Sequence, residues 1–173
     1  TLFRFVENNV KNSKIVKVSG QAVREKFESI KKATQIKTLD KTFQRYYTDE
    51  LELPIGPCHG DLTLSNILFS QSSDEIVLID FLDSFIESPI ADIAKIRQDT
   101  KHKWSTFIYS KQYDKNKVQI SLDYLDSKLD AMFRHFSFYR YYKLFQFINL
   151  ARILPYSQNQ KTTNYLMKEI CSI

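Results

Sequence analysis

The feature that most constrains the fold is a change of hydrophobic period in the middle of the chain. Two short apolar runs, Asn66–Phe69 and Glu75–Asp80, are separated by the polar segment Ser70–Asp74. Such runs around a polar turn predict an antiparallel β-hairpin. On both sides of this segment, apolar residues instead recur every three or four positions, which is the helical period. The sequence therefore predicts a mostly helical α+β fold with a small central hairpin.

Few residues interrupt the helical segments. The chain has only three glycines and four prolines, a composition that favours long helices joined by few tight turns. Residues 20–33 and 36–47 are expected to form amphipathic helices, and Leu53–Pro57 stops any helix because its two prolines and glycine cannot continue one. Helical spacing resumes after Pro89, over residues 90–94, 122–136, 138–154 and 165–170.

Length and composition limit the class of protein. With 173 residues, of which 43% are hydrophobic, the chain can form one packed domain. Only two cysteines, Cys58 and Cys171, are present, which favours a reduced cytoplasmic protein over a disulfide framework. No apolar run reaches the roughly 18 residues of a membrane span. The net charge of +5 is spread along the chain, which indicates a mildly basic surface rather than a nucleic-acid-binding protein.

Three polar side chains near the predicted hairpin suit phosphoryl transfer. Asp61 and Asn66 lie five positions apart in the preceding loop, and Asp80 ends the second strand, which would return it opposite Asn66. A carboxylate can orient the proton of an attacking hydroxyl group, while an amide and a second carboxylate supply oxygen ligands to Mg²⁺. The alternative interpretation is that Asp61 and Asn66 are turn residues and that Asp80 caps a strand.

The stretch His59-Gly60-Asp61, followed by Asn66, resembles the catalytic loop of the aminoglycoside phosphotransferase and choline kinase group, within the protein-kinase-like superfamily. That group carries H-G-D-x-x-x-x-N where protein kinases carry H-R-D-x-x-x-x-N. The resemblance implies that Asp61 is the catalytic base or hydroxyl-orienting carboxylate. It also implies that Asn66 and Asp80 bind the magnesium ion that bridges the nucleotide phosphates, and that His59 is a scaffold residue of the loop.

The resemblance extends downstream. Ser88–Ala94 is similar to the group's D-P-x-x-D-L-A segment, in which the second aspartate braces the catalytic loop, and Asp92 occupies that position. A compatible alternative for Asp92 is an acid in the first turn of a helix, favoured by the helix dipole. Leu82 stands where D-F-G has glycine, so no positive φ is expected there. Asp83 adds a carboxylate three residues after Asp80. It either approaches the metal or substrate or is a solvated loop acid, and the second interpretation is favoured. The specific motifs cover Cys58–Ala94.

The part of the chain before the motif lacks a glycine-rich loop that would cover phosphates. Lys17, followed by Glu25 or Glu28, superficially imitates the lysine and glutamate pair of a kinase. The residues between Glu28 and Asp61 leave no room for the remaining sheet, hinge and helices, so we expect Lys17 to be a surface lysine. We expect residues 1–173 to form a single domain, the C-terminal lobe of a protein-kinase-like fold, with a nucleotide-clamping N-terminal lobe elsewhere in the full-length protein.

The resemblance implies a phosphotransferase that depends on Mg²⁺ and on ATP or another nucleoside triphosphate. Its acceptor would be a hydroxyl group of a small molecule such as a sugar, an amino alcohol or an aminoglycoside. The alternative is a non-catalytic kinase-like lobe that binds a partner or a nucleotide. A cationic acceptor would need an acidic cleft, for which Asp83, Glu87 and Asp99 are the candidates. The basic net charge leans toward a neutral or anionic, sugar-like acceptor.

Further basic and aromatic residues have two interpretations each. Arg140 and Arg152 are able to reach a phosphate or a carboxylated substrate, but most arginines on helices are solvated. Lys101–Trp104 either meets an anionic or sugar substrate or forms a polar loop anchored by a buried tryptophan. His102 and His135 stand alone, and each is expected to be structural or solvent-facing rather than a ligand.

Overall fold

A computed structural model describes residues 2–70, 72 and 75–173 of the protein. Its helices are α1 (Leu2–Asn12), α2 (Gln21–Thr34), α3 (Thr38–Tyr46), α4 (Pro89–Thr100), α5 (Trp104–Ile108), α6 (Lys115–Phe133), α7 (Tyr142–Ala151) and α8 (Gln160–Cys171). One two-stranded antiparallel sheet pairs β1 (Lys14–Ser19) with β2 (Glu50–Ile55), and another pairs β3 (Ile67–Ser70) with β4 (Glu75–Leu78). The prediction of a mostly helical α+β fold is confirmed.

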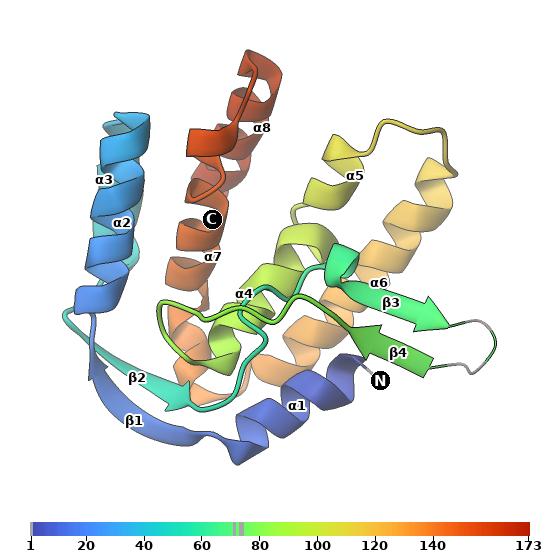
Figure 1. Ribbon diagram of the computed structural model, residues 1–173. Coiled ribbons are helices and arrows are strands. Elements are labelled where there is room, and N and C mark those ends of the chain that lie inside the picture. Colours follow the sequence, from blue (N-terminus) through green and yellow to red (C-terminus); the bar gives the residue numbers. More distant parts are fainter. Residues whose placement is uncertain (1, 71, 73–74) are drawn as a thin grey trace.

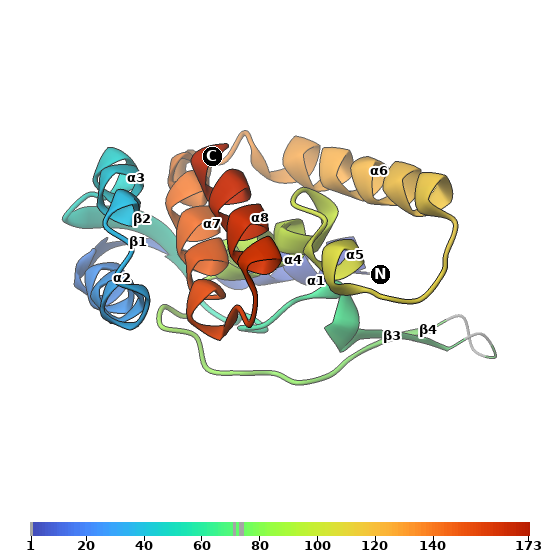
Figure 2. The same cartoon turned by 90° about the horizontal axis from the view of Figure 1, so that it is seen from above.

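Helix α4 lies at the centre of the molecule (Figure 1). It packs against α7, α6 and α1, and in the view from above the segments that precede and follow the β3–β4 hairpin run past it (Figure 2). Its apolar residues Ile90, Ile93 and Ile96 are completely buried in a core that includes Leu144 and Phe147 of α7. The central helix therefore provides the rigid element against which the connecting loops are placed.

The sequence of α4 explains its start and its two polar faces. Pro89 opens the helix at a position where its missing N–H is not needed. All α4 residues except Ala91 are buried, and they include charged residues. Asp92, Lys95 and Asp99 recur at spacings of three and four, so they share one helical face. Buried charges require partners. The charged side chains of α4 therefore contact groups of other segments and hold those segments against the helix.

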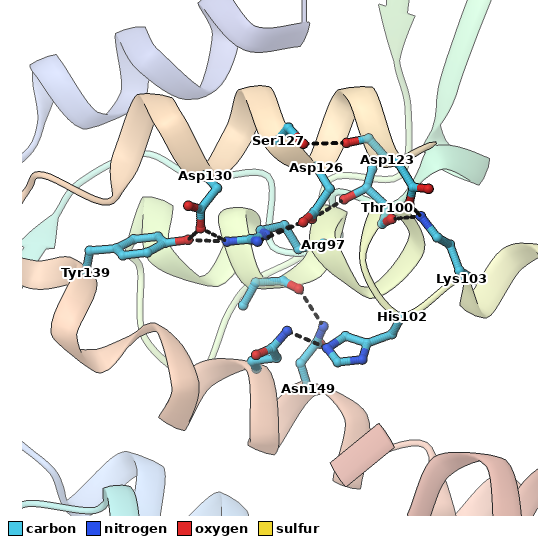
Figure 3. Close-up of polar contacts among 12 residues, drawn as sticks. Arg97, Thr100, His102, Lys103, Asp123, Asp126, Ser127, Asp130, Tyr139 and Asn149 are labelled. Carbon is cyan, nitrogen blue, oxygen red and sulfur yellow. Dashed lines mark hydrogen bonds and ion pairs between the residues drawn. The ribbon is translucent and has the colours of Figure 1, made fainter. Parts of the chain in front are cut away.

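Arg97, on another face of α4, connects this helix to α6 (Figure 3). Its Nε and Nη2 atoms each donate to a different carboxylate oxygen of Asp126 at 2.8 Å, and Nη1 lies 2.8 Å from Oδ1 of Asp130. Nη1 also contacts the Tyr139 hydroxyl, and the guanidinium carbon lies 4.7 Å from the centre of the Tyr142 ring. This geometry uses the planar, forked guanidinium of arginine and fixes α4 relative to α6.

Most local predictions agree with the structure. The expected helices 20–33 and 36–47 are α2 and α3, and the expected hairpin is β3–β4, in which Ile67 is opposite Leu78. Within the predicted polar turn Ser70–Asp74, residues 71, 73 and 74 lie outside the described residues.

Several features were not predicted. Helices α1 and α5 and the β1–β2 sheet are additional, so the prediction of a single hairpin was incomplete. The helix expected over residues 138–154 is divided into a 3₁₀ segment (Ser137–Tyr141), α7 and a second 3₁₀ segment (Leu154–Tyr156). Pro155 explains the second break, because proline removes a donor that an α-helix needs.

We find no described helix whose length and apolar character would allow it to cross a membrane.

Candidate active site

The loop before the hairpin requires glycine at position 60. Gly60 has φ +79°, and a Cβ atom at this position would lie 1.8 Å from the carbonyl oxygen of Leu82. The segments that contain Gly60 and Leu82 are also joined by a hydrogen bond, in which the Leu82 N–H donates to the His59 carbonyl at 3.0 Å. The backbones of the segments around Asp61 and Asp80 therefore touch directly, which only a residue without a side chain permits.

Asp92 holds this loop from α4. Its side chain is completely buried, and its two carboxylate oxygens accept hydrogen bonds from the N–H groups of His59 at 2.6 Å and Gly60 at 2.9 Å. Burial raises the pKa of Asp92 to about 6, although both hydrogen bonds oppose the increase. The predicted contact between Asp92 and the loop is thus present in the structure.

Asp99 holds the next part of the same loop. Its carboxylate accepts hydrogen bonds from the N–H groups of Leu64 at 2.9 Å and Ser105 at 3.1 Å. Burial also raises the pKa of Asp99. Glu87, in turn, accepts hydrogen bonds from the Ser84 N–H at 2.9 Å and from the Cys58 thiol at 3.2 Å. Neither Asp99 nor Glu87 is among the described residues that border the cavities beside Asp61.

His59 is completely buried between the two segments. Its Nδ1 atom accepts a hydrogen bond from the Asp61 N–H at 3.3 Å, and its ring stacks on that of Phe81 with 4.2 Å between centroids. Its Nε2 atom has no hydrogen-bond partner among the described residues. The ring thus links the backbone of Asp61 to the residue that follows Asp80.

The carboxylate of Asp61 has two chemically different sides. Oδ2 lies 3.1 Å from the Asn66 side-chain nitrogen, which also donates to the Asp61 backbone carbonyl at 2.9 Å. Oδ1 lies 2.8 Å from Nζ of Lys95 and 2.9 Å from Nη2 of Arg152. One oxygen therefore faces an amide and the other faces two cations.

Asn66 and Asp80 are brought to the same end of the hairpin. The Ile79 N–H donates to the Asn66 carbonyl at 3.1 Å, continuing the β3–β4 ladder, and Asp80 follows directly. Asp80 is exposed and adopts φ +59°, a left-handed conformation that aspartate tolerates better than most residues. Leu82 has no positive φ, as predicted, and the backbone reversal lies at Asp80 instead.

These two side chains fit a magnesium ion shared with phosphates. The Asn66 side chain uses its nitrogen as the donor to Asp61, and no described residue donates to its oxygen. An amide oxygen and an exposed carboxylate are ligands that Mg²⁺ prefers, and this ion commonly takes few protein ligands together with waters and substrate phosphates. Within the described residues, no cluster of three or more histidine, cysteine, aspartate or glutamate side chains offers a separate metal site.

Two adjoining cavities open beside Asp61. The larger has a volume of about 520 Å³ and is bordered by Asp61, while the smaller, of about 90 Å³, is bordered by Gly60 and Asp83. Both are bordered by Lys26 of α2, Lys95 of α4 and Arg152, which follows α7. The candidate site thus includes three cationic side chains from distant parts of the chain.

Sequence reasoning missed two of these cations. Lys95 lies three positions after Asp92, a helical spacing that would have placed it on the same face of α4. Lys26 carries no comparable signal. Arg152 was considered as a binding residue and does contact Asp61, whereas Arg140 pairs at 2.8 Å with Glu52 on the surface.

Other candidates have structural partners. Trp104 is half-buried and borders the larger cavity. His102 is buried and its Nδ1 atom lies 2.8 Å from Glu169, while His135 is exposed. Lys17 has a side chain that is 72% exposed and pairs with Glu50 rather than with Glu25 or Glu28, as expected of a surface lysine.

Comparison with known proteins bears on the same region. The family model of the phosphotransferase enzyme family matches residues 16–114. This range includes the loop around Asp61, the hairpin with Asp80, and α4. A comparison with curated proteins found no match.

Proposed function

The chain belongs to the phosphotransferase enzyme family, and from this premise we propose that it transfers the γ-phosphoryl group of ATP, or of another nucleoside triphosphate, to a hydroxyl group of a small molecule. The two-sided environment of the Asp61 carboxylate supports this proposal. Oδ2 adjoins Asn66, a suitable magnesium ligand, whereas Oδ1 contacts Lys95. Asp61 and Lys95 both border a cavity able to hold an acceptor. Phosphoryl transfer requires a residue that orients the acceptor hydroxyl group toward the phosphate bound by magnesium. Asp61 lies between the proposed magnesium ligand and the cavity, so its position suits this role.

In the proposed reaction Asp61 orients the acceptor hydroxyl group and accepts its proton. The hydroxyl oxygen forms a bond to the γ-phosphorus atom, the bond from that atom to the bridging oxygen breaks, and the nucleoside diphosphate leaves. Asn66 and Asp80 would hold the magnesium ion, which neutralises negative charge on the phosphates when it is bound. Catalysis of this kind depends mainly on positioning and electrostatic stabilisation. The contacts of Asp61 with Lys95 and Arg152 suit such a role because they restrict the carboxylate to one orientation.

The remaining residues of the site would act by positioning Asp61. Asp92 and Asp99 hold the backbone at two points of the loop, His59–Gly60 and Leu64. His59 supports the N–H of Asp61 and packs on Phe81. We propose that these contacts keep Asp61 and Asp80 in fixed relation during the reaction.

The proposal is tested with the full-length protein. Calorimetry measures binding of ATP with and without Mg²⁺, and a coupled assay measures ADP formation with a panel of sugars, polyols and amino alcohols. Asp80→Asn is expected to lose the magnesium-dependent part of nucleotide binding. Asp61→Asn is expected to retain nucleotide binding but to lower kcat by about 10²-fold to 10⁴-fold.

Asp83→Asn is the matched control, since it removes an exposed carboxylate from the same segment as Asp80. It should leave nucleotide binding unchanged. Transfer that persists in Asp61→Asn would contradict the catalytic role of Asp61. Nucleotide binding without turnover of any acceptor would favour the non-catalytic lobe.

A further inference from the structure

We propose that the acceptor carries an anionic group, a phosphate or a carboxylate, in addition to the hydroxyl that is phosphorylated. This inference rests on the proposed function and specifies the class of its substrate. The anionic group would bind Lys26 and Arg152 in the larger cavity, while the hydroxyl group approaches Asp61.

The charge distribution around the cavity is the first reason. Lys95 is only 5% exposed, and Lys95 and Arg152 share a single carboxylate oxygen of Asp61. Lys26 is half-buried, borders the same cavity and has no acidic partner among the described residues. Three cations thus face one carboxylate in the larger cavity.

Such an imbalance favours an anionic ligand. Cationic side chains that converge in a partly buried site repel one another, and a bound anion relieves this repulsion. The planar guanidinium of Arg152 is suited to paired hydrogen bonds with phosphate or carboxylate oxygens. A cationic acceptor would instead meet like charges. Asp83 borders the smaller cavity only, so it does not balance the cations of the larger one.

The position of the cations assigns this anion to the acceptor rather than to the nucleotide. Neither Asn66 nor Asp80 is among the described residues that border the two cavities. Lys95 and Arg152 contact Oδ1 of Asp61, whereas Asn66 contacts Oδ2. The proposed magnesium ligands and the cations therefore meet Asp61 through different oxygens.

The cavity also has the size and wall of a small-molecule site. Its volume of about 520 Å³ lies within the usual range for ligand pockets. Trp104, Ile153 and Pro155 also border the cavity. An aromatic and apolar wall beside cations suits a polyol or sugar that carries a phosphate or carboxylate.

The test uses four six-carbon polyols that differ in charge: sorbitol, sorbitol 6-phosphate, gluconate and glucamine. Calorimetry measures their binding to the full-length protein without nucleotide. We expect at least one of the two anions to bind about tenfold or more tightly than sorbitol, the effect of one charge-assisted hydrogen bond. Comparison of sorbitol 6-phosphate with gluconate shows whether the site prefers a phosphate or a carboxylate. Glucamine is expected to bind more weakly than sorbitol.

Lys26→Met and Arg152→Met identify the residues responsible. Each variant should reduce the affinity for the preferred anion about tenfold and reduce the affinity for sorbitol by a smaller factor. Lys32→Met is the matched control, because it removes the same charge from an exposed position of α2 that does not border the cavity.

Several results would overturn the inference. One is that sorbitol or glucamine binds as tightly as both anions, and a second is that neither anion binds. A third is that the variants weaken the binding of MgATP but not that of the anions. A protein that binds an anion in the expected way, yet never phosphorylates any acceptor, would instead refute the proposed function alone.

Discussion

The ammonium group of Lys95 lies 2.8 Å from Oδ1 of Asp61, and Lys95 is only 5% exposed. The carboxylate is more accessible, with 23% of its side chain exposed, and has a second cationic partner in Arg152. The loss of one partner therefore has different consequences for the two charges of this ion pair. Lys95 needs Asp61, whereas Asp61 has another partner and partial access to water.

This asymmetry predicts an order of stabilities. Asp61→Ala should destabilise the protein by about 3–5 kcal/mol, because it leaves a buried ammonium group without its carboxylate. Lys95→Met should have a smaller effect, since Asp61 retains Arg152 and solvent. The double variant should recover most of the loss, because it also removes the buried ammonium group that Asp61→Ala leaves unpaired. Urea unfolding measures all three. A double variant as unstable as the sum of the single variants would contradict this account.

Asp92 predicts a pH dependence of stability. The pKa of Asp92 is about 6 in the folded protein and 3.8 ordinarily, so between these values the folded state holds more protons than the unfolded state. The contribution of Asp92 to the free energy of unfolding is therefore highest below pH 4 and decreases as the pH rises to 6, by an amount on the order of 3 kcal/mol. Asp92→Asn should remove this slope, as measured by urea unfolding from pH 4 to pH 7.

The control for Asp92 is Asp83→Asn, which alters an exposed carboxylate and should keep the slope. At neutral pH, Asp92→Asn should also reduce phosphoryl transfer, because an amide has only one oxygen to accept the two N–H groups of His59 and Gly60. An unchanged slope in Asp92→Asn would show that another group causes it.

Gly60 predicts a strong steric effect. Gly60→Ala places a Cβ atom 1.8 Å from the Leu82 carbonyl at a residue with φ +79°. The backbone strain alone is about 1–3 kcal/mol, and separation of the two segments should also abolish transfer. In Gly56→Ala the new Cβ meets chiefly the Ser13 hydroxyl oxygen, at 2.4 Å, and that side chain is able to rotate. Thermal unfolding should show the smaller loss for Gly56→Ala, and equal losses would contradict the model of touching loops.

Arg97 predicts a loss of stability without a direct effect on chemistry. Arg97→Lys removes the paired contact with Asp126 and cannot preserve the contacts with Asp130 and Tyr139 together. We expect a destabilisation of about 2–3 kcal/mol, with KM and kcat of the folded protein close to those of the wild type. The exposed Arg134→Lys is the control. A large decrease in kcat of fully folded Arg97→Lys would contradict this prediction and show that the contact between α4 and α6 affects catalysis.

The sequence predictions succeeded where a short segment contains its own structural information. The hairpin follows from two apolar runs, and α2 from apolar positions at helical spacing. The contact between Asp92 and the loop was expected from the motif that surrounds it. The β1–β2 sheet was not expected, because its strands pair across α2 and α3. The segment Leu53–Pro57, whose first residues belong to β2, was interpreted only as a helix stop.

By itself, the sequence determined the local frame of the site: the loop with Asp61 and Asn66, the hairpin that returns Asp80, and one polar face of α4. Repeating backbone geometry converts spacing directly into such arrangements. Only the tertiary structure decided that Lys26, Lys95 and Arg152 converge beside Asp61. Their positions depend on how α2, α4 and α7 pack, and packing is determined by burial summed over the whole core rather than by the pattern within any one segment.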